Sequence, residues 1–292
     1  MTKFNELIRF CAEQYNNIAF CDECKMDFCR KCNTHDCYLC LQYIHSFSNK
    51  TDHYSCEKVT YNYILKHGYR YASEMAWAFL DVRDFFALEQ SLSIFSIGSG
   101  PSTELYGASI IFRYYYLNYY GFDLNDKWHA IQEFNKKSLG NDRLQITYLG
   151  YEFIEYVKIN DLKCDILVLN YILSDFVKFH PKECEIFIDE LVKLIMEGRF
   201  RVILINDVML LYASGTGFSC MEKIAKKLVD TKDLSFNLER RHFDSPNQWQ
   251  FPYGLKHRNE IFTKHIAEEA IPFDPFKTCR SIQLIVKTLK KS

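Results

Sequence analysis

Apolar runs of strand length alternate with helical patterns from residue 91 to the end of the chain. The strand-like runs span residues 92–97, 115–122, 144–149, 165–172, 201–207, 234–243 and 280–289. Helical spacing of apolar residues fills most of the gaps, notably 102–113, 126–138, 181–197 and 219–230. Strands that alternate with helices pair in parallel through crossover connections. We therefore expect an α/β domain with a seven-stranded, mostly parallel, doubly wound sheet over residues 91–292.

The first ninety residues follow other patterns. Residues 1–20 carry apolar side chains at helical spacing, whereas residues 21–56 have little apolar periodicity and many cysteines. Residues 61–90 read as one or two helices with an apolar face. The sequence thus predicts a cysteine-rich module over 1–60, a helical connector over 61–90 and the α/β domain over 91–292.

Composition narrows the class of protein. Of the 292 residues, 48% are hydrophobic and 16% aromatic, which is enough for a proper core. A formal net charge of −1 argues against wholesale electrostatic capture of nucleic acid. Charges interrupt every apolar run before it reaches membrane-spanning length, and the first residues lack the pattern of a signal peptide. We expect an intracellular, cytoplasmic protein in a reducing compartment.

The stretch "SIGSGPSTELYG" is the first candidate binding site. Gly98 and Gly100 end a strand, and a helix begins after them. A dinucleotide loop would have a third glycine at residue 103, where Thr103 stands, and a phosphate loop of the Walker type would have a Gly-Lys-Ser/Thr triplet, which is absent. What remains is a tight turn that lets a ligand approach the backbone, with a helix start that offers N–H groups to a carboxylate.

Two polar residues follow the next strands. Asp123 comes after the second strand, where a carboxylate can accept hydrogen bonds from both ribose hydroxyls of an adenosine ligand. Asn170 ends the fourth strand at the same edge of the sheet. In this order, "IFSIGSGPSTELYGA", "YYGFDLNDKW" and "CDILVLNYILSDF" resemble motif I, the acidic position after it and motif IV of class I S-adenosylmethionine (SAM)-dependent methyltransferases. The resemblance covers about residues 90–290.

The resemblance implies SAM as cofactor and a role for each matched residue. Gly98 and Gly100 would border the methionine part, Asp123 the ribose, and Glu152 or Phe153 the adenine, while Asn170 would line the site beside the methyl group. Asn170 and Tyr171 are the candidate catalytic residues. The sequence departs from the family at Ser96, where an acidic residue usually contacts the amino group of the ligand, and at Ser102, where many members have glycine. We include Ser96 among the cofactor-binding candidates, acting through a water.

The cysteine spacing predicts a metal module. Four x2 pairs provide eight ligands, enough for two tetrahedral zinc ions: Cys21, Cys24, Cys29, Cys32, Cys37, Cys40, His53 and Cys56. An interleaved pairing would join the first pair with the third and the second with the fourth; a sequential pairing is the rival. His35 or His45 are alternatives to His53. An iron–sulfur cluster would leave two histidines unused.

Two functions of different classes fit these features. The first is a SAM-dependent methyltransferase that acts on RNA or protein, with a structural zinc module that recognises the substrate or a partner. The second is a non-catalytic, methyltransferase-like scaffold in a larger assembly, which the serines at 96 and 102 favour.

Overall fold

One mixed sheet organises the described part of the chain. The computed structural model describes residues 3–18, 54, 57–208, 217–229, 235–243 and 281–289. Their strands lie in the order β3-β2-β1-β4-β5-β7-β6. The bounds are β1 (Ser91–Ile97), β2 (Tyr116–Phe122), β3 (Leu144–Leu149), β4 (Cys164–Asn170), β5 (Phe200–Val208), β6 (Ser235–Phe243) and β7 (Ser281–Leu289). The first five strands pair in parallel, and β7 runs antiparallel to both β5 and β6. The predicted α/β sheet is confirmed as seven-stranded and mixed.

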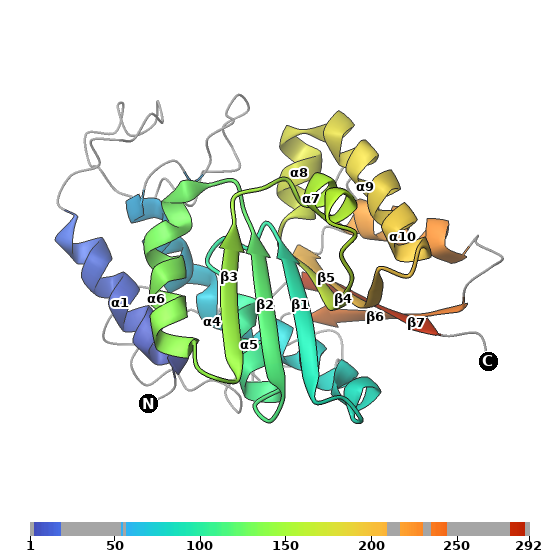
Figure 1. The fold of residues 1–292 in the computed structure, drawn as a ribbon. Coiled ribbons are helices and arrows are strands. Elements are labelled where there is room, and N and C mark those ends of the chain that lie inside the picture. The colour runs from blue at the N-terminus through green and yellow to red at the C-terminus, as the bar shows by residue number, and fades with distance from the viewer. Residues whose placement is uncertain are drawn as a thin grey trace.

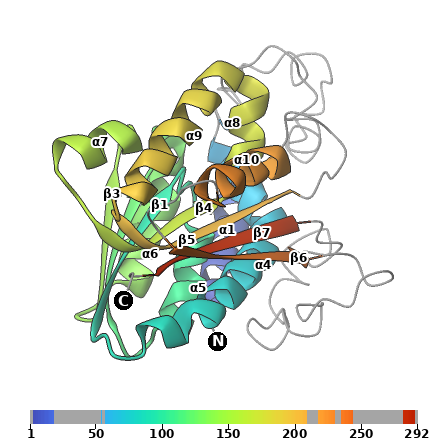
Figure 2. The ribbon, with the colours of Figure 1, turned by 90° about the vertical axis from the view of Figure 1, so that its right-hand side faces the viewer.

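Helices cover both faces of this sheet (Figures 1 and 2). On one face lie α1 (Lys3–Asn17), α4 (Glu57–Arg83), α5 (Thr103–Ile111) and α6 (His129–Leu139). On the other lie α7 (Phe153–Ile159), α8 (Leu173–Phe179), α9 (Pro181–Met196) and α10 (Gly217–Val229). Two short 3₁₀ turns, η1 (Asp84–Phe86) and η2 (Asp126–Trp128), complete the described helical elements.

The alternation of side chains along each strand builds two cores. On β5, Val202 and Leu204 belong to the core under α4 and α5, whereas Ile203 and Ile205 belong to the core under α9 and α10. Successive strand residues point to opposite faces, so an unbroken apolar run is what a strand covered on both faces requires. The central strands therefore appear in the sequence as continuous apolar runs rather than as alternating polar and apolar residues.

Small residues let α4 and α5 pack closely. A Cβ on Gly107 of α5 would lie 2.8 Å from the backbone nitrogen of Ala76 on α4. Helix α1 packs on α4 in turn, with Phe4, Leu7 and Ile8 buried in the same core as the sheet. The first helix is therefore joined to the α/β core, although it lies within the segment assigned to the cysteine-rich module; the division at residue 60 stays a prediction.

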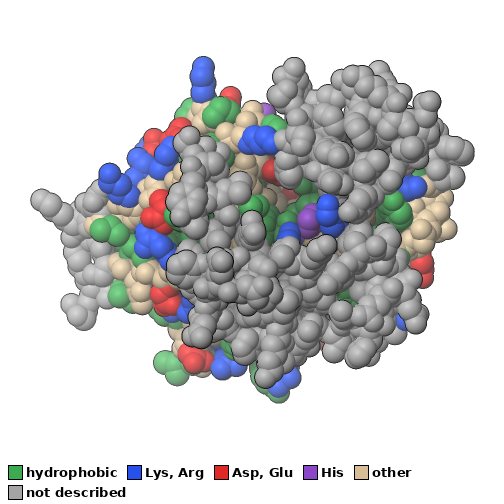
Figure 3. Space-filling view, turned by 180° about the vertical axis from the view of Figure 1, so that it is seen from behind, with side chains coloured by type: hydrophobic (Ala, Val, Ile, Leu, Met, Phe, Trp, Pro, Cys, Tyr) green, Lys and Arg blue, Asp and Glu red, His purple; other side chains and the backbone are tan. Residues whose placement is uncertain are grey.

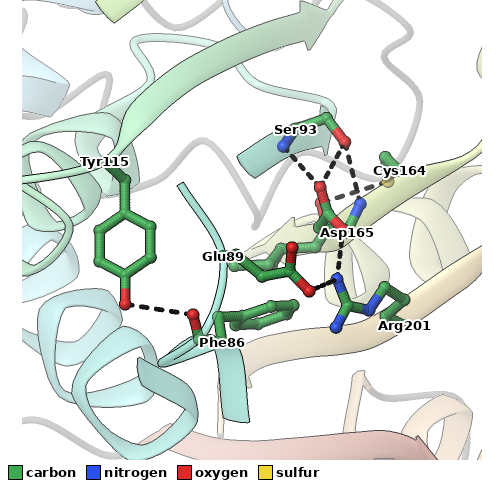
Figure 4. A network of polar contacts seen from close by, with 8 residues as sticks. Phe86, Glu89, Ser93, Tyr115, Cys164, Asp165 and Arg201 are labelled. Carbon is green, nitrogen blue, oxygen red and sulfur yellow. Dashed lines mark hydrogen bonds and ion pairs between the residues drawn. The ribbon is translucent and has the colours of Figure 1, made fainter. Parts of the chain in front are cut away.

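A polar network joins the amino ends of β1, β4 and β5 (Figure 4). Asp165 accepts hydrogen bonds from the backbone nitrogen and the hydroxyl of Ser93, both at 2.9 Å, and pairs with Arg201 at 3.0 Å. Arg201 also pairs with Glu89 at 2.9 Å. These contacts hold together the amino ends of the three strands, at the opposite edge of the sheet from their carboxyl ends. Among the described helices, none is long and apolar enough to cross a membrane.

Candidate functional site

A cavity of about 630 Å³ lies at the carboxyl ends of β1, β2 and β4. Its walls come from the loop after β1, the segment after β2, the starts of α7 and α8, and the aromatic side chains of α4. The sheet order reverses between β1 and β4, so their connections leave the sheet on opposite faces. Doubly wound sheets bind ligands at such switch points, and the volume is typical of a small-molecule site.

The loop after β1 adopts left-handed backbone at three positions. These are Gly98 (φ 57°), Gly100 (φ 45°) and Ser102 (φ 55°). Side chains are already close to both glycines: a Cβ on Gly98 would lie 2.2 Å from Ile172, and one on Gly100 would lie 3.4 Å from Trp128. Glycine is required at residue 98 for both conformation and space. Ser102 adopts the same left-handed conformation, which glycine would adopt without steric cost.

Asp123 holds this loop in place. One carboxylate oxygen accepts a hydrogen bond from the Gly100 nitrogen at 2.7 Å, and the other accepts one from Asn125 at 2.8 Å. Burial raises the pKa of Asp123, and these two bonds partly counteract the increase. A carboxylate has about four acceptor positions, so Asp123 retains capacity for a ligand's hydroxyl groups.

Two side chains of helix α6 donate hydrogen bonds to the backbone of the same loop. Gln132 donates to the carbonyl of Gly100 at 3.1 Å, and Asn135 donates to that of Pro101 at 2.9 Å. Both amides are buried. The sequence interpretation missed them, since a polar residue within a helical pattern looks like a solvated position.

Ser96 lies beneath the cavity rather than in its wall. Its side chain is 1% exposed, and its hydroxyl donates a hydrogen bond to Glu104 at 2.6 Å. Tyr119 on β2 donates to the same oxygen of Glu104, also at 2.6 Å. Glu104, in the first turn of α5, is itself a wall residue of the cavity. Ser96 is thus separated from the cavity wall by Glu104, and its predicted role toward a ligand through a water stays a prediction.

A second polar cluster lies at the ends of β4 and β5. Asn170 accepts a hydrogen bond from Asn206 at 3.0 Å, and Asn206 also donates to Glu74 of α4 at 3.0 Å. The Tyr171 hydroxyl donates to Glu74 at 2.8 Å. Tyr171 has φ 58°, a conformation that costs a non-glycine residue about 1–3 kcal/mol and tends to occur at functional sites. Asn170 and Tyr171 both line the cavity.

Aromatic side chains form the wall on the α4 side. Tyr71 stacks on Tyr171 with ring centroids 3.7 Å apart, and Tyr63 lies edge-on to Trp128 at 5.6 Å. Tyr54 contacts both Tyr63 and Trp128. The sequence interpretation treated residues 61–90 only as a connector. The signal was present: residues 63, 67 and 71 repeat at four-residue spacing and share one helix face.

Glu152 and Phe153 line the wall of the cavity at the start of α7. The Glu152 carboxylate caps the helix by accepting a hydrogen bond from Glu155 at 2.8 Å, and it is exposed. Phe153 is buried against Phe122 and Phe95. The structure therefore brings seven of the eight predicted cofactor-binding and catalytic residues around one cavity, Ser96 being the exception. Their roles toward a ligand stay predictions.

All eight predicted zinc ligands lie outside the described residues. Within the part of the chain that the structure describes, no group of histidine, cysteine and acidic side chains is arranged to hold a metal ion. The described cysteines, Cys11, Cys164, Cys184 and Cys220, are free and buried, as expected of small apolar residues.

The sequence matches no family model and no curated protein. Similar folds occur among solved structures. The plantazolicin methyltransferase BpumL, in complex with a monoazolic desmethylPZN analog and SAH, is 11% identical with a TM-score of 0.48, over 87% of this chain and 96% of that one. The precorrin-6y C5,15-methyltransferase of Geobacter metallireducens is 13% identical with a TM-score of 0.41 (74% and 89%). An rRNA methylase of Streptococcus thermophilus is 9% identical with a TM-score of 0.42 (72% and 95%). These likenesses concern the fold, and the ligand must be argued from the cavity itself.

Proposed function

We propose that the protein is a SAM-dependent methyltransferase that acts on a macromolecule, RNA or protein. The observation that carries this proposal is the convergence of Asp123, the Gly98–Gly100 turn and Asn170 on one cavity at the switch point of the sheet. A ligand with an adenosine at one end and an amino acid at the other needs a carboxylate for its ribose, a close backbone turn, and apolar surface for its base. The cavity has all three, the last from Phe122, Phe153 and Tyr151.

Methyl transfer depends more on the alignment of the methyl group with its acceptor than on reactive side chains. SAM supplies an electrophilic methyl group. Asp123 and the glycine turn fix the position of the ligand, and Asn170 and Tyr171 at the end of β4 border the space that an acceptor would enter. Hydrogen bonds from Asn206 and to Glu74 hold Asn170 and Tyr171 in place. Such positioning of two reactants supplies much of the rate of an in-line transfer.

On the described part of one face, charge does not single out either acceptor class. In the view from behind (Figure 3), Lys and Arg side chains alternate with acidic and hydrophobic ones over the described surface of that face. The acceptor is therefore best sought directly, by incubating the protein with radiolabelled SAM and cell extract and treating the product with ribonuclease or protease. A label removed by only one of the two enzymes identifies the class of acceptor.

Calorimetric titration with SAM tests the binding site. We expect one saturable site on the wild-type protein and at least a tenfold weaker one in Asp123→Ala, since hydrogen bonds to a charged group contribute about 1.5–3 kcal/mol. Asp126→Ala is the matched control: it removes an equal charge from an exposed residue of the same cavity wall and should leave the affinity within about twofold.

Two results would contradict this proposal. If SAM does not bind the wild-type protein, the function fails altogether. If Asp123→Ala binds SAM as the wild type does, the assignment of the ribose end fails. Binding of SAM without methyl transfer to any extract would favour the scaffold function instead.

We also propose that residues 1–60 bind zinc through the eight cysteine and histidine positions and thereby recognise the substrate or a partner. The x2 spacing of the four pairs supports this, because each pair can place two ligands on one ion. Elemental analysis of the purified protein should find two zinc ions per chain. A protein that purifies without metal and gains no structure on zinc addition would contradict it.

A further inference from the structure

Glu104 is a buried carboxylate in the wall of the cavity that none of the predicted roles uses. It is 2% exposed and lies in the first turn of α5, directly after the glycine loop. Helical side chains tilt toward the N-terminus of their helix, so the carboxylate is directed back toward that loop. Residue 96, which lacks the acidic side chain usual in similar loops, lies on the neighbouring strand β1 and contacts it.

The contact with Ser96 places the Glu104 carboxylate where an acidic residue 96 would act. The Ser96 hydroxyl oxygen and the Cγ of an aspartate are both bonded to Cβ, so they occupy nearly the same place. The Glu104 oxygen lies 2.6 Å from that hydroxyl. A glutamate from the helix thus brings its carboxylate within one hydrogen bond of the position that an aspartate on the strand would fill.

The charge of Glu104 has no cationic partner within the described residues. The side-chain donors that contact it are the hydroxyls of Ser96 and Tyr119, both neutral. Burial raises the pKa of Glu104, and these hydrogen bonds only partly counteract the increase. A buried carboxylate is costly unless paired, and a ligand's ammonium group would supply the missing charge.

We propose that Glu104 receives the amino group of the methionine part of SAM and so replaces the acidic side chain that residue 96 does not provide. Ser96 and Tyr119 act as positioning residues, because their two hydrogen bonds fix the orientation of the carboxylate. The proposal rests on the proposed function, since it assigns one end of the same ligand.

Calorimetry with two ligands tests the assignment. The probes are SAM and 5′-methylthioadenosine, which keeps the adenosine and lacks the amino-acid part. In Glu104→Gln, which keeps the size of the side chain and an acceptor oxygen, we expect SAM to bind at least tenfold more weakly and methylthioadenosine to bind as it does to the wild type. The direction of the change in SAM affinity is informative. If Glu104 lay beside the ligand's carboxylate instead, removing the charge of Glu104 would strengthen SAM binding.

A second variant returns the charge to the strand. We expect Ser96→Asp in the Glu104→Gln background to recover most of the lost affinity for SAM, again without changing methylthioadenosine. Retained methylthioadenosine binding shows in both variants that the cavity is folded.

The outcomes separate this inference from the function on which it rests. If the wild type binds SAM and Glu104→Gln binds it equally well, the assignment of Glu104 is wrong and the function stands. Equal losses for both probes would assign Glu104 a purely structural role and also overturn the proposal. If the wild type binds neither probe, the proposed function itself fails.

Discussion

Replacing Gly107 by alanine tests how tightly α4 and α5 are packed. The added Cβ would lie 2.8 Å from the nitrogen and 3.0 Å from the Cα of Ala76, and 3.2 Å from the carbonyl oxygen of Ala72. All three are backbone atoms of α4, so no side chain can rotate away. Comfortable contacts between heavy atoms are about 3.5–4.0 Å, so the helices must separate by roughly 0.5–1 Å.

Two opposing terms set the size of the effect. Overpacking a well-packed interface costs about 1–3 kcal/mol, and rigid backbone neighbours put this site at the upper end. Alanine in place of glycine inside a helix contributes about 1 kcal/mol in the other direction. We expect Gly107→Ala to lower the free energy of unfolding by about 1–2 kcal/mol, measured by urea unfolding followed by circular dichroism.

Gly68 in the middle of α4 provides the matched control. A Cβ there would meet two side-chain atoms, the ring Cζ of Phe4 at 3.1 Å and the Cγ2 methyl of Ile64 at 3.3 Å, which need to shift by only a few tenths of an ångström. The same helix propensity then favours alanine, so Gly68→Ala should be neutral or slightly stabilising. If Gly107→Ala proves as stable as Gly68→Ala, the reasoning from backbone contact is wrong.

Three further predictions follow from single contacts. Gly98→Ala should weaken SAM binding at least tenfold, because its φ of 57° and the approach of Ile172 both force the loop to move; an unchanged calorimetric affinity would contradict this. Asp165→Ala should lower the free energy of unfolding in urea by about 2–3 kcal/mol yet leave SAM affinity intact, since it lies at the opposite edge of the sheet. Burial raises the pKa of Asp207 to about 6 from 3.8. Its protonated form therefore stabilises the fold, and this contribution is lost as pH rises from about 4 through 6. Relative to Asp207→Asn, the wild type should lose about 3 kcal/mol in urea unfolding over that range; parallel pH profiles would refute the assignment.

The strands could be predicted closely because they are buried on both faces. The run predicted at 144–149 is β3 as observed, and the others differ by a residue or two at their ends. The antiparallel pairing of β6 and β7 agrees with the hairpin-like last pair that the methyltransferase resemblance implies. The residues of β7 alone do not give its direction, since an apolar run fits parallel and antiparallel neighbours alike. Helices α7 and α8, of seven residues each, span too few turns for a periodic pattern to be recognised.

The candidate site divides in the same way. Gly98, Gly100, Asp123 and Asn170 follow strand ends, and strand order alone brings such residues to one edge. Glu74 accepts a hydrogen bond from Tyr171 of the cavity wall, and Gln132 donates one to Gly100; both act from helices through packing that no local pattern encodes. Ser96 and Glu104 lie eight residues apart, on a strand and on a helix, and their contact cannot be read from the sequence. From the sequence alone, Ser96 therefore looked like the loss of an acidic side chain.

Helix α4 joins stability to ligand binding. Its side chains Tyr63 and Tyr71 form the aromatic wall, and Glu74 accepts a hydrogen bond that fixes Tyr171 in the wall of the cavity. Its backbone at Ala76 sets how closely α5 approaches, and α5 begins with Thr103 and Glu104. A displacement of α5 by roughly half an ångström lengthens a 2.6 Å hydrogen bond beyond the usual range for O–H donors. Gly107→Ala should therefore weaken SAM binding more than methylthioadenosine binding, because only SAM carries the amino group that Glu104 would hold.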